Sequence, residues 1–317
     1  ANNVIGGTTA ADRNVISGGT SSGIALTSDD GSTTGNRIIG NYIGTNAAGT
    51  AAVGNGGQGI YVDWATGSSI GGTGAGEGNV ISGTTSWVGI QLTALAASNT
   101  IQGNYIGLDA AGASVIANAW GGIYAQSSGN VIGGSAAGAA NVISGSGGFG
   151  ITLDGAGATG NVVTGNRIGT DATGTLVRGN GGAGVVLSNG AANNRIGGTQ
   201  AGEGNWIANG GGDGIELSAA GTGNALLGNL VWDNGGLAID LLGGDGVTAN
   251  DAGDADTGSN ALQNYPVLGS AIVAGGATTI TGSIDSTANT TLRLEFYSSP
   301  TADASGHGEA AVFLGAT

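Results

Sequence analysis

The sequence is dominated by a short element of the form Asn-x-(Ile, Val or Leu) that returns at nearly constant intervals along most of the chain. Successive copies begin 30 to 33 residues apart. Such a chain builds its core by stacking repeated units, because one short unit cannot bury its apolar face alone. The element begins at Asn3, Asn36, Asn99, Asn130, Asn161, Asn194 and Asn224, with Ser68 in the one remaining place.

Two further apolar elements accompany the first in every repeat. Three short apolar elements, each bounded by Gly or Asn, indicate three strands per coil with tight turns between them. We therefore predict an all-β fold, a right-handed parallel β-helix of about eight coils that spans residues 1–245. The second element opens at Asn14, Asn41, Asn79, Asn104, Asn141, Asn166, Asn205 and Asn229, and the third at Ile24, Ile60, Ile90, Ile123, Ile151, Val185, Ile215 and Ile239.

The position of the Asn residues predicts columns of stacked amides along the rod. Asn tolerates the left-handed backbone of a tight corner, and its side chain can hydrogen-bond the Asn of the coils above and below. We expect Asn99, Asn130 and Asn161 to align in this way. The offset between the first and second Asn alternates between 11 and 5 residues. The repeating unit is therefore a pair of coils, and equivalent loops project about 9.6 Å apart.

Several recurring segments resemble a known family. NVISG occurs at 14–18, 79–83 and 141–145, GNYIG at 40–44 and 103–107, and GNRIG at 165–169. These segments resemble the parallel β-helix repeat proteins of the pectate-lyase-like superfamily, particularly the Gly- and Asn-rich arrays of large bacterial surface proteins. The resemblance covers about 245 residues and implies the fold. It does not imply an activity, because that superfamily includes lyases, hydrolases, epimerases and proteins without catalysis.

The composition restricts the partners and the location. The net charge is −15, from 21 acidic residues against 6 Arg and no Lys, which argues against nucleic acid as a partner. No apolar run is long enough to span a membrane, so we expect no membrane insertion. The absence of Cys excludes disulfides and is compatible with a bacterial exported protein. We expect an extracellular or cell-surface location in a bacterium.

Three carboxylates near the end of the repeats are candidate catalytic residues. The outward position after each third-element Ile carries an acid in only two coils, at Glu216 and Asp240, and Asp213 precedes Glu216 by three residues. Sugar chemistry needs an acid and a base or nucleophile a few ångströms apart. A polysaccharide-active enzyme would use this group. The alternative is an acidic patch that protects the end of the rod from unwanted strand pairing.

Aromatic residues form a second candidate site. Trp87 and Trp120 each lie three residues before the third-element Ile of neighbouring coils, and Phe149 lies close to the same row in the next coil. Exposed aromatic rings can bind the apolar faces of sugar rings, so this row is a candidate carbohydrate-binding surface. The alternative is that the three rings cover a corner of the core.

Residues 246–262 form an acidic linker with a candidate metal site. Asp251, Asp254 and Asp256 place hard oxygen ligands at short spacing in a Gly-containing segment, as calcium requires. The segment lacks the residue order of an EF-hand, and a solvated linker is the alternative. Residues 263–317 contain three alternating segments, 278–284, 291–299 and 310–317, which suggest a partial immunoglobulin-like β segment.

Neither end of the repeat array carries an obvious cap, and solenoids normally need one. We therefore expect self-association into a homopolymer, or contact with neighbouring domains of a longer chain. The function expected first is a non-catalytic structural or adhesive protein, with filaments formed by end-to-end stacking or strand donation. The alternative is a polysaccharide-active enzyme (a hydrolase, lyase or epimerase) or a carbohydrate-binding module. Ice binding is disfavoured, because the outward row is not a flat Thr array.

Overall fold

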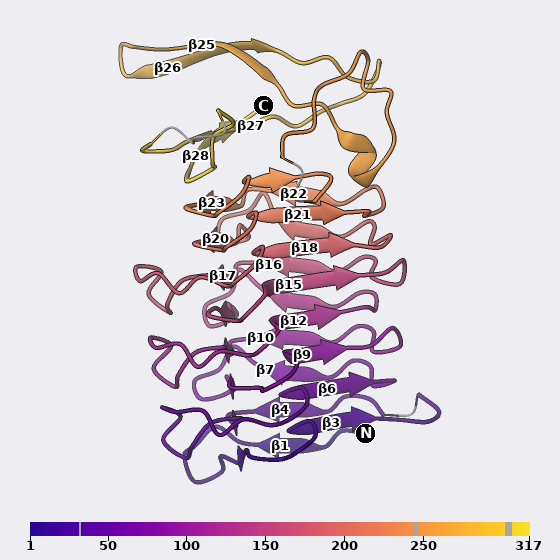
Figure 1. Ribbon diagram of the computed structural model, residues 1–317, viewed down its shortest axis with the longest axis vertical. Helices are drawn as coiled ribbons and strands as arrows, with labels where there is room; N and C mark the ends of the chain where they lie inside the picture. The colour runs from indigo at the N-terminus through magenta and orange to yellow at the C-terminus, as the bar shows by residue number, and fades with distance from the viewer. Residues whose placement is uncertain (32, 244–245, 302–305) are drawn as a thin grey trace.

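The computed structural model describes residues 1–31, 33–243, 246–301 and 306–317. Stacked coils form a column whose N-terminus lies at the base, and the C-terminal segment lies across its upper end (Figure 1). Three parallel sheets of eight strands run along the column, and each coil contributes one strand to each sheet. The predicted parallel β-helix of eight coils is confirmed. Its expected final residues, 244 and 245, lie outside the described part.

Each sheet takes every third strand of the chain. Sheet A contains β1 (Val4–Gly6), β4 (Arg37–Ile39), β7 (Ser69–Gly71), β10 (Thr100–Gln102), β13 (Val131–Gly133), β16 (Val162–Thr164), β19 (Arg195–Gly197) and β22 (Ala225–Leu227). Sheet B contains β2 (Val15–Ile16), β5 (Tyr42–Ile43), β8 (Val80–Ile81), β11 (Tyr105–Ile106), β14 (Val142–Ile143), β17 (Arg167–Ile168), β20 (Trp206–Ala208) and β23 (Leu230–Trp232). Sheet C contains β3 (Ile24–Thr27), β6 (Ile60–Asp63), β9 (Val88–Leu92), β12 (Gly121–Ala125), β15 (Phe149–Asp154), β18 (Val185–Ser188), β21 (Ile215–Ser218) and β24 (Ile239–Asp240).

The core is a set of aliphatic stacks inside the column. In β6, Ile60 and Val62 are fully buried while Tyr61 between them is partly exposed, as the two-residue period of a strand requires. Equivalent residues pair in register from coil to coil, for example Ile60 with Ile90. Because each inward side chain rests on its equivalents, burial is nearly complete in every coil between the ends.

Two Asn ladders run beside the sheets as predicted. The Asn99 amide N–H donates to Oδ1 of Asn130 at 2.9 Å, and the Asn130 N–H donates to Oδ1 of Asn161 at 2.8 Å. Ser68 occupies its place in this ladder through its hydroxyl, which accepts the N–H of Asn36. The second ladder joins the Asn that precedes each strand of sheet B. The ladder side chains are buried in the interior coils, so they satisfy backbone groups that water cannot reach.

A third set of Asn residues was not predicted. Asn55, Asn118 and Asn180 lie near the ends of the long loops of alternate coils, and Asn234 takes the same place in the short turn after β23. Each of the four donates to a carbonyl of sheet B. Each side-chain oxygen also accepts an N–H at the same corner of the preceding coil. Each of these Asn residues therefore hydrogen-bonds backbone groups of the coil that precedes its own.

The long loops form a hydrogen-bonded row of their own. The N–H of Ala110 donates to the carbonyl of Gly49 at 2.9 Å, and the N–H of Ala172 donates to Gly112 at 2.8 Å. Asp109 and Asp171 accept N–H groups of their own turns, so each carboxylate caps its turn. These hydrogen bonds outweigh the effect of burial and lower the pKa of both carboxyls.

The described residues of the C-terminal segment contain a 3₁₀ helix, η1 (Ser259–Leu262), and four strands. Antiparallel pairing joins β25 (Val267–Ala274) to β26 (Ala277–Ser283), and β27 (Glu295–Ser298) to β28 (Val312–Ala316). Three strands were predicted here, and β25 was missed because its apolar residues do not alternate with polar ones. The four strands form two separate sheets. Within the described residues, no helix is long and apolar enough to cross a membrane.

The C-terminal segment contacts the last coil at sheets A and B, so the expectation that this end lacks a cap is wrong there, whereas β24 ends sheet C without a further partner strand in the described part of the chain. Asn260 continues the first ladder, because its Oδ1 accepts the N–H of Asn224 at 3.0 Å. At sheet B, Ala310 pairs with Val231 in an antiparallel bridge. Glu309 accepts the N–H groups of Asp233 and Asn234, and Glu295 accepts the N–H of Gly228. These residues are the cap of the solenoid.

The ladder predicts a large effect for Asn130→Ala. This change leaves the Asn99 N–H buried without its acceptor and removes the donors to Ser127 and Asn161. We expect a loss of about 2–4 kcal/mol in the free energy of unfolding. Chemical denaturation followed by far-UV circular dichroism measures it.

Asn3→Ala is the matched control, because Asn3 is the exposed end of the same ladder and donates one side-chain hydrogen bond. Its expected loss is below about 1 kcal/mol. Equal losses for the two variants would contradict a structural role for the buried ladder.

Candidate functional site

The three acids predicted as an alternative catalytic group lie at the C-terminal end of sheet C. Glu216 of β21 pairs directly with Asp240 of β24, as the expected register requires. Asp213 lies in the turn that precedes β21. The structure therefore brings the three carboxylates together at the end of one sheet.

Two of these carboxylates accept hydrogen bonds from nearby backbone N–H groups. Oδ1 of Asp213 accepts the N–H of Leu237 at 2.6 Å, and Oδ1 of Asp240 accepts the N–H groups of Leu242 and Gly243. Asp213 is 6% exposed and Asp240 is 1% exposed. Glu216 is more accessible than the other two. A polymer on the surface thus reaches one carboxylate rather than a pair.

Burial and mutual repulsion perturb this group. Desolvation raises the pKa of Glu216, and the negative charges of Asp213 and Asp240 raise it further. Desolvation also raises the pKa of Asp213; the hydrogen bond from Leu237 opposes this, and the charge of Asp240 adds to it. A carboxyl with a raised pKa can act as a general acid. Among the described residues, no salt bridge neutralises Glu216 or Asp213.

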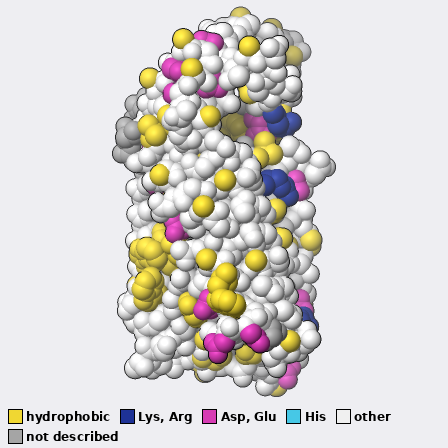
Figure 2. Space-filling model, turned by 90° about the vertical axis from the view of Figure 1, so that its right-hand side faces the viewer, with side chains coloured by type: hydrophobic (Ala, Val, Ile, Leu, Met, Phe, Trp, Pro, Cys, Tyr) yellow, Lys and Arg dark blue, Asp and Glu magenta, His cyan; other side chains and the backbone are white. Residues whose placement is uncertain are grey.

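The aromatic residues form a contiguous cluster farther along sheet C. The ring centroids of Trp87 and Trp120 are 5.7 Å apart, and those of Trp120 and Phe149 are 5.1 Å apart, both in edge-on geometry. Trp87 is 46% exposed and Trp120 is 42% exposed. Hydrophobic side chains gather in patches on the face shown in Figure 2, among few charged ones. The rings thus offer exposed edges and faces to the solvent.

Polar residues that the sequence analysis missed adjoin the aromatic cluster. The Tyr124 ring lies 5.5 Å from that of Trp120, and its hydroxyl donates to Asp154. Gln126 and Asn189 also donate to Asp154. Burial alone would raise the pKa of Asp154, but the hydrogen bonds lower it overall, so this carboxylate stays charged. The repeat pattern does not mark Asp154 as a functional residue, because the equivalent positions in the next two coils are Ser188 and Ser218.

The acidic linker brings its three predicted ligands together. Asp251, Asp254 and Asp256 each place a carboxylate oxygen within 4.8 Å of the other two. Oδ1 of Asp254 accepts the N–H of Asn264 at 2.8 Å, and Oδ2 accepts the Ser286 hydroxyl at 2.9 Å. The linker is therefore held against the chain on both sides of the first C-terminal hairpin.

The third carboxylate differs from the other two. Oδ1 of Asp256 is buried and has no hydrogen-bond partner. Desolvation raises the pKa of Asp256, and the charges of Asp251 and Asp254 raise it further. Clustered carboxylate oxygens that repel one another suit a hard divalent cation, which supplies the missing positive charge. The donor set fits calcium.

Comparisons with protein-family models, curated proteins and solved structures gave no match. The geometry of the chain itself therefore carries the functional argument.

The carboxylate group predicts a pH-dependent effect for Glu216→Gln. Because the pKa of Glu216 is raised in the folded state, folding stability falls as pH rises past the ordinary carboxyl range. We expect the variant to be more stable than the wild type at pH 7 and equally stable at pH 3, where both side chains are neutral. Thermal unfolding at the two pH values measures this difference.

Asp29→Asn is the control, because Asp29 is in an exposed loop and faces no other acid in this group. We expect no comparable gain at pH 7. A Glu216→Gln variant that is less stable at pH 7 would show that the charged form is favoured and would contradict the assignment.

Proposed function

We propose that the chain is a rigid, non-catalytic rod of a structural or adhesive protein, located outside a bacterial cell or on its surface. The observation that carries this proposal is the pairing of strands in three sheets from the first coil to the last, together with the Asn ladders that run beside them. Such a column keeps its length and exposes sheet faces and loops at fixed spacing. Rigid spacing is useful for adhesion, and it needs no reactive group.

The distribution of acids supports a non-catalytic role. Asp213 and Asp240 are committed to backbone N–H groups and are nearly inaccessible. Membership of the pectate-lyase-like superfamily is part of this proposal, on the strength of the coil architecture and the NVISG and GNYIG segments. A polysaccharide-active enzyme, with Glu216 as its accessible acid, is the alternative.

The cap disfavours end-to-end stacking of a second copy on the C-terminal end of the rod. Ala310, Glu295 and Glu309 already occupy backbone groups that a second copy would need. Self-association, if it occurs, would therefore use the sheet faces or the other end. Contact with neighbouring domains of a longer chain fits the same geometry.

The exposed cluster of Trp87, Trp120 and Phe149 favours a carbohydrate as the adhesive target. Edge-on packing holds the rings in place before a ligand arrives, so little conformational entropy is lost on binding. Asp154 and Gln126 lie beside the rings and offer polar groups to sugar hydroxyls. This combination of fixed aromatic surface and few polar groups is typical of carbohydrate recognition.

For Trp120→Ala, we predict weaker binding to immobilised polysaccharides by about tenfold, because Trp120 contacts both of the other rings. Pull-down and affinity electrophoresis on a polysaccharide panel measure binding, and a reducing-end assay on the same panel measures turnover. Trp64→Ala is the control, because Trp64 is 38% exposed but stands outside the cluster. Turnover that disappears in Glu216→Gln would establish the enzyme alternative.

Calcium bound at Asp251, Asp254 and Asp256 would stabilise the position of the cap on the last coil. The linker that carries these acids also contains Asn260 of the first ladder, and Asn264 donates to the carbonyls of Asp251 and Asp285. A cation that orders the linker would therefore hold the first C-terminal hairpin near the end of the rod. This role is structural rather than catalytic.

Calcium is expected to raise the unfolding temperature of the wild type, by an amount equivalent to about 2.7 kcal/mol at one hundred times the dissociation constant. Asp256→Asn should abolish this response, because Asp256 supplies the oxygen without a partner. Without calcium, the variant should be slightly more stable than the wild type, because it removes a repelled charge. Differential scanning calorimetry with calcium, magnesium or chelator measures both effects, and an equal response of the two proteins would exclude the site.

A further inference from the structure

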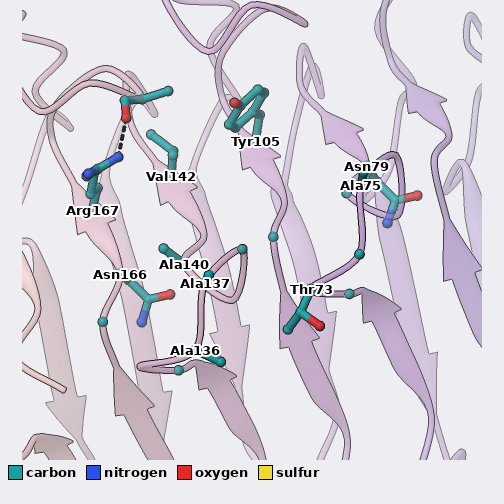
Figure 3. A pocket seen from close by; sticks show the side chains of 18 of the residues that line it. Thr73, Ala75, Asn79, Tyr105, Ala136, Ala137, Ala140, Val142, Asn166 and Arg167 are labelled. Atoms are coloured by element: carbon teal, nitrogen blue, oxygen red, sulfur yellow. Dashed lines mark hydrogen bonds between the residues drawn. The ribbon is translucent and has the colours of Figure 1, made fainter. Parts of the chain in front are cut away.

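A long groove lies over the outer face of sheet B, away from the aromatic cluster of sheet C. Its volume is about 690 Å³. Its floor consists of the outward side chains of six successive strands, which pair in register from β5 to β20. Figure 3 shows Tyr105, Val142 and Arg167 side by side on this floor. The floor residues in order are Tyr42, Val80, Tyr105, Val142, Arg167 and Trp206.

Loops from two corners of the column form the walls. On one side, the loops that contain Thr73 and Ala136 line the groove, and the lining side chains that Figure 3 labels there, Thr73, Ala75, Ala136 and Ala137, are small. On the other side, Gly112 packs so close to Tyr105 that a Cβ there would lie 2.9 Å from its ring. Ala, Gly, Ser and Thr dominate these walls. The groove is open because its walls have almost no side-chain bulk.

Aromatic residues recur along the floor in β5, β11 and β20, which are two and then three coils apart. Tyr42 and Tyr105 are separated by one strand, so their rings lie two coils apart, at about 9.6 Å. Both rings are partly exposed, as is that of Trp206. The interval is close to the length of two sugar units in an extended polysaccharide. One chain could therefore place alternate sugars over the Tyr42 and Tyr105 rings.

The charged groups of the groove are already engaged by the protein. Of its described lining residues, only Arg13 and Arg167 are charged. The Arg13 guanidinium lies 4.0 Å from the Tyr42 ring centroid, and its Nε donates to the carbonyl of Gly40. Arg167 lies 5.1 Å from the Trp206 ring and donates to the carbonyl of Ala172. Each guanidinium thus stacks over an aromatic ring rather than standing as an isolated cation.

From this arrangement we propose that the groove on sheet B binds a linear, neutral, β-linked polysaccharide. Aromatic and guanidinium planes contact the apolar faces of the sugars, and wall hydroxyls and backbone groups bond to the sugar hydroxyls. A net charge of −15 disfavours long anionic chains, including acidic polysaccharides. The proposal does not depend on the sheet C cluster, because the two surfaces share no residue.

Isothermal titration calorimetry of the purified chain tests it. The probes are neutral hexasaccharides of β-1,4-linked glucose, mannose, xylose or galactose, together with the corresponding disaccharides and an acidic hexagalacturonate. We expect at least one neutral hexasaccharide to bind more tightly than its disaccharide and more tightly than hexagalacturonate. Tyr105→Ala should weaken that binding by about tenfold.

Two further variants show whether the hexasaccharide lies in this groove or elsewhere on the rod. Ala137→Trp places a bulky ring on an exposed wall residue and should block the hexasaccharide without changing the melting temperature. Trp87→Ala on sheet C should leave this binding unchanged. The experiment therefore tests binding in the groove independently of binding at the sheet C cluster. The proposal is overturned if no neutral hexasaccharide binds, if the acidic one binds more tightly, or if Tyr105→Ala and Ala137→Trp both bind like the wild type.

Discussion

The structure depends on the hydrogen bonds that join each coil to the next. Every strand of the column is short, from two to six residues, and no strand would be stable alone. Stability comes from repetition, because each backbone segment and each ladder Asn pairs with its equivalents above and below. The aliphatic core follows from this registry, since in-register stacking brings one Ile onto another.

The column could be predicted well from the sequence, because the spacing of a few repeated residues determines the register of the strands. The spacing of the Asn motif placed Asn99, Asn130 and Asn161 in one line, and the third-element Ile residues placed Glu216 opposite Asp240. The structure confirms both. A solenoid is favourable for such prediction, because nearly all its contacts are between sequence-equivalent positions. The three linker acids also came together, since they are close in the chain.

Other features could not be read from the repeat because they depend on single contacts between unlike segments. The cap uses Glu295, Glu309 and Ala310, which have no counterpart in the coils, so no periodic signal marks them. The network around Asp154 joins side chains from the coils on either side of it, and their types do not repeat. Burial of Asp240 likewise follows from the turn after β24, whose backbone N–H groups turn toward it.

The direction of the coil-to-coil hydrogen bonds has a mechanical consequence. These bonds lie along the axis of the rod, so tension between the chain ends acts on them one after another rather than all at once. The rod should yield by unwinding, and each released coil of about 31 residues would add roughly 100 Å of extended chain. A surface molecule built in this way would lengthen stepwise under load, absorb the energy of a sudden pull, and rewind from the coils that remain.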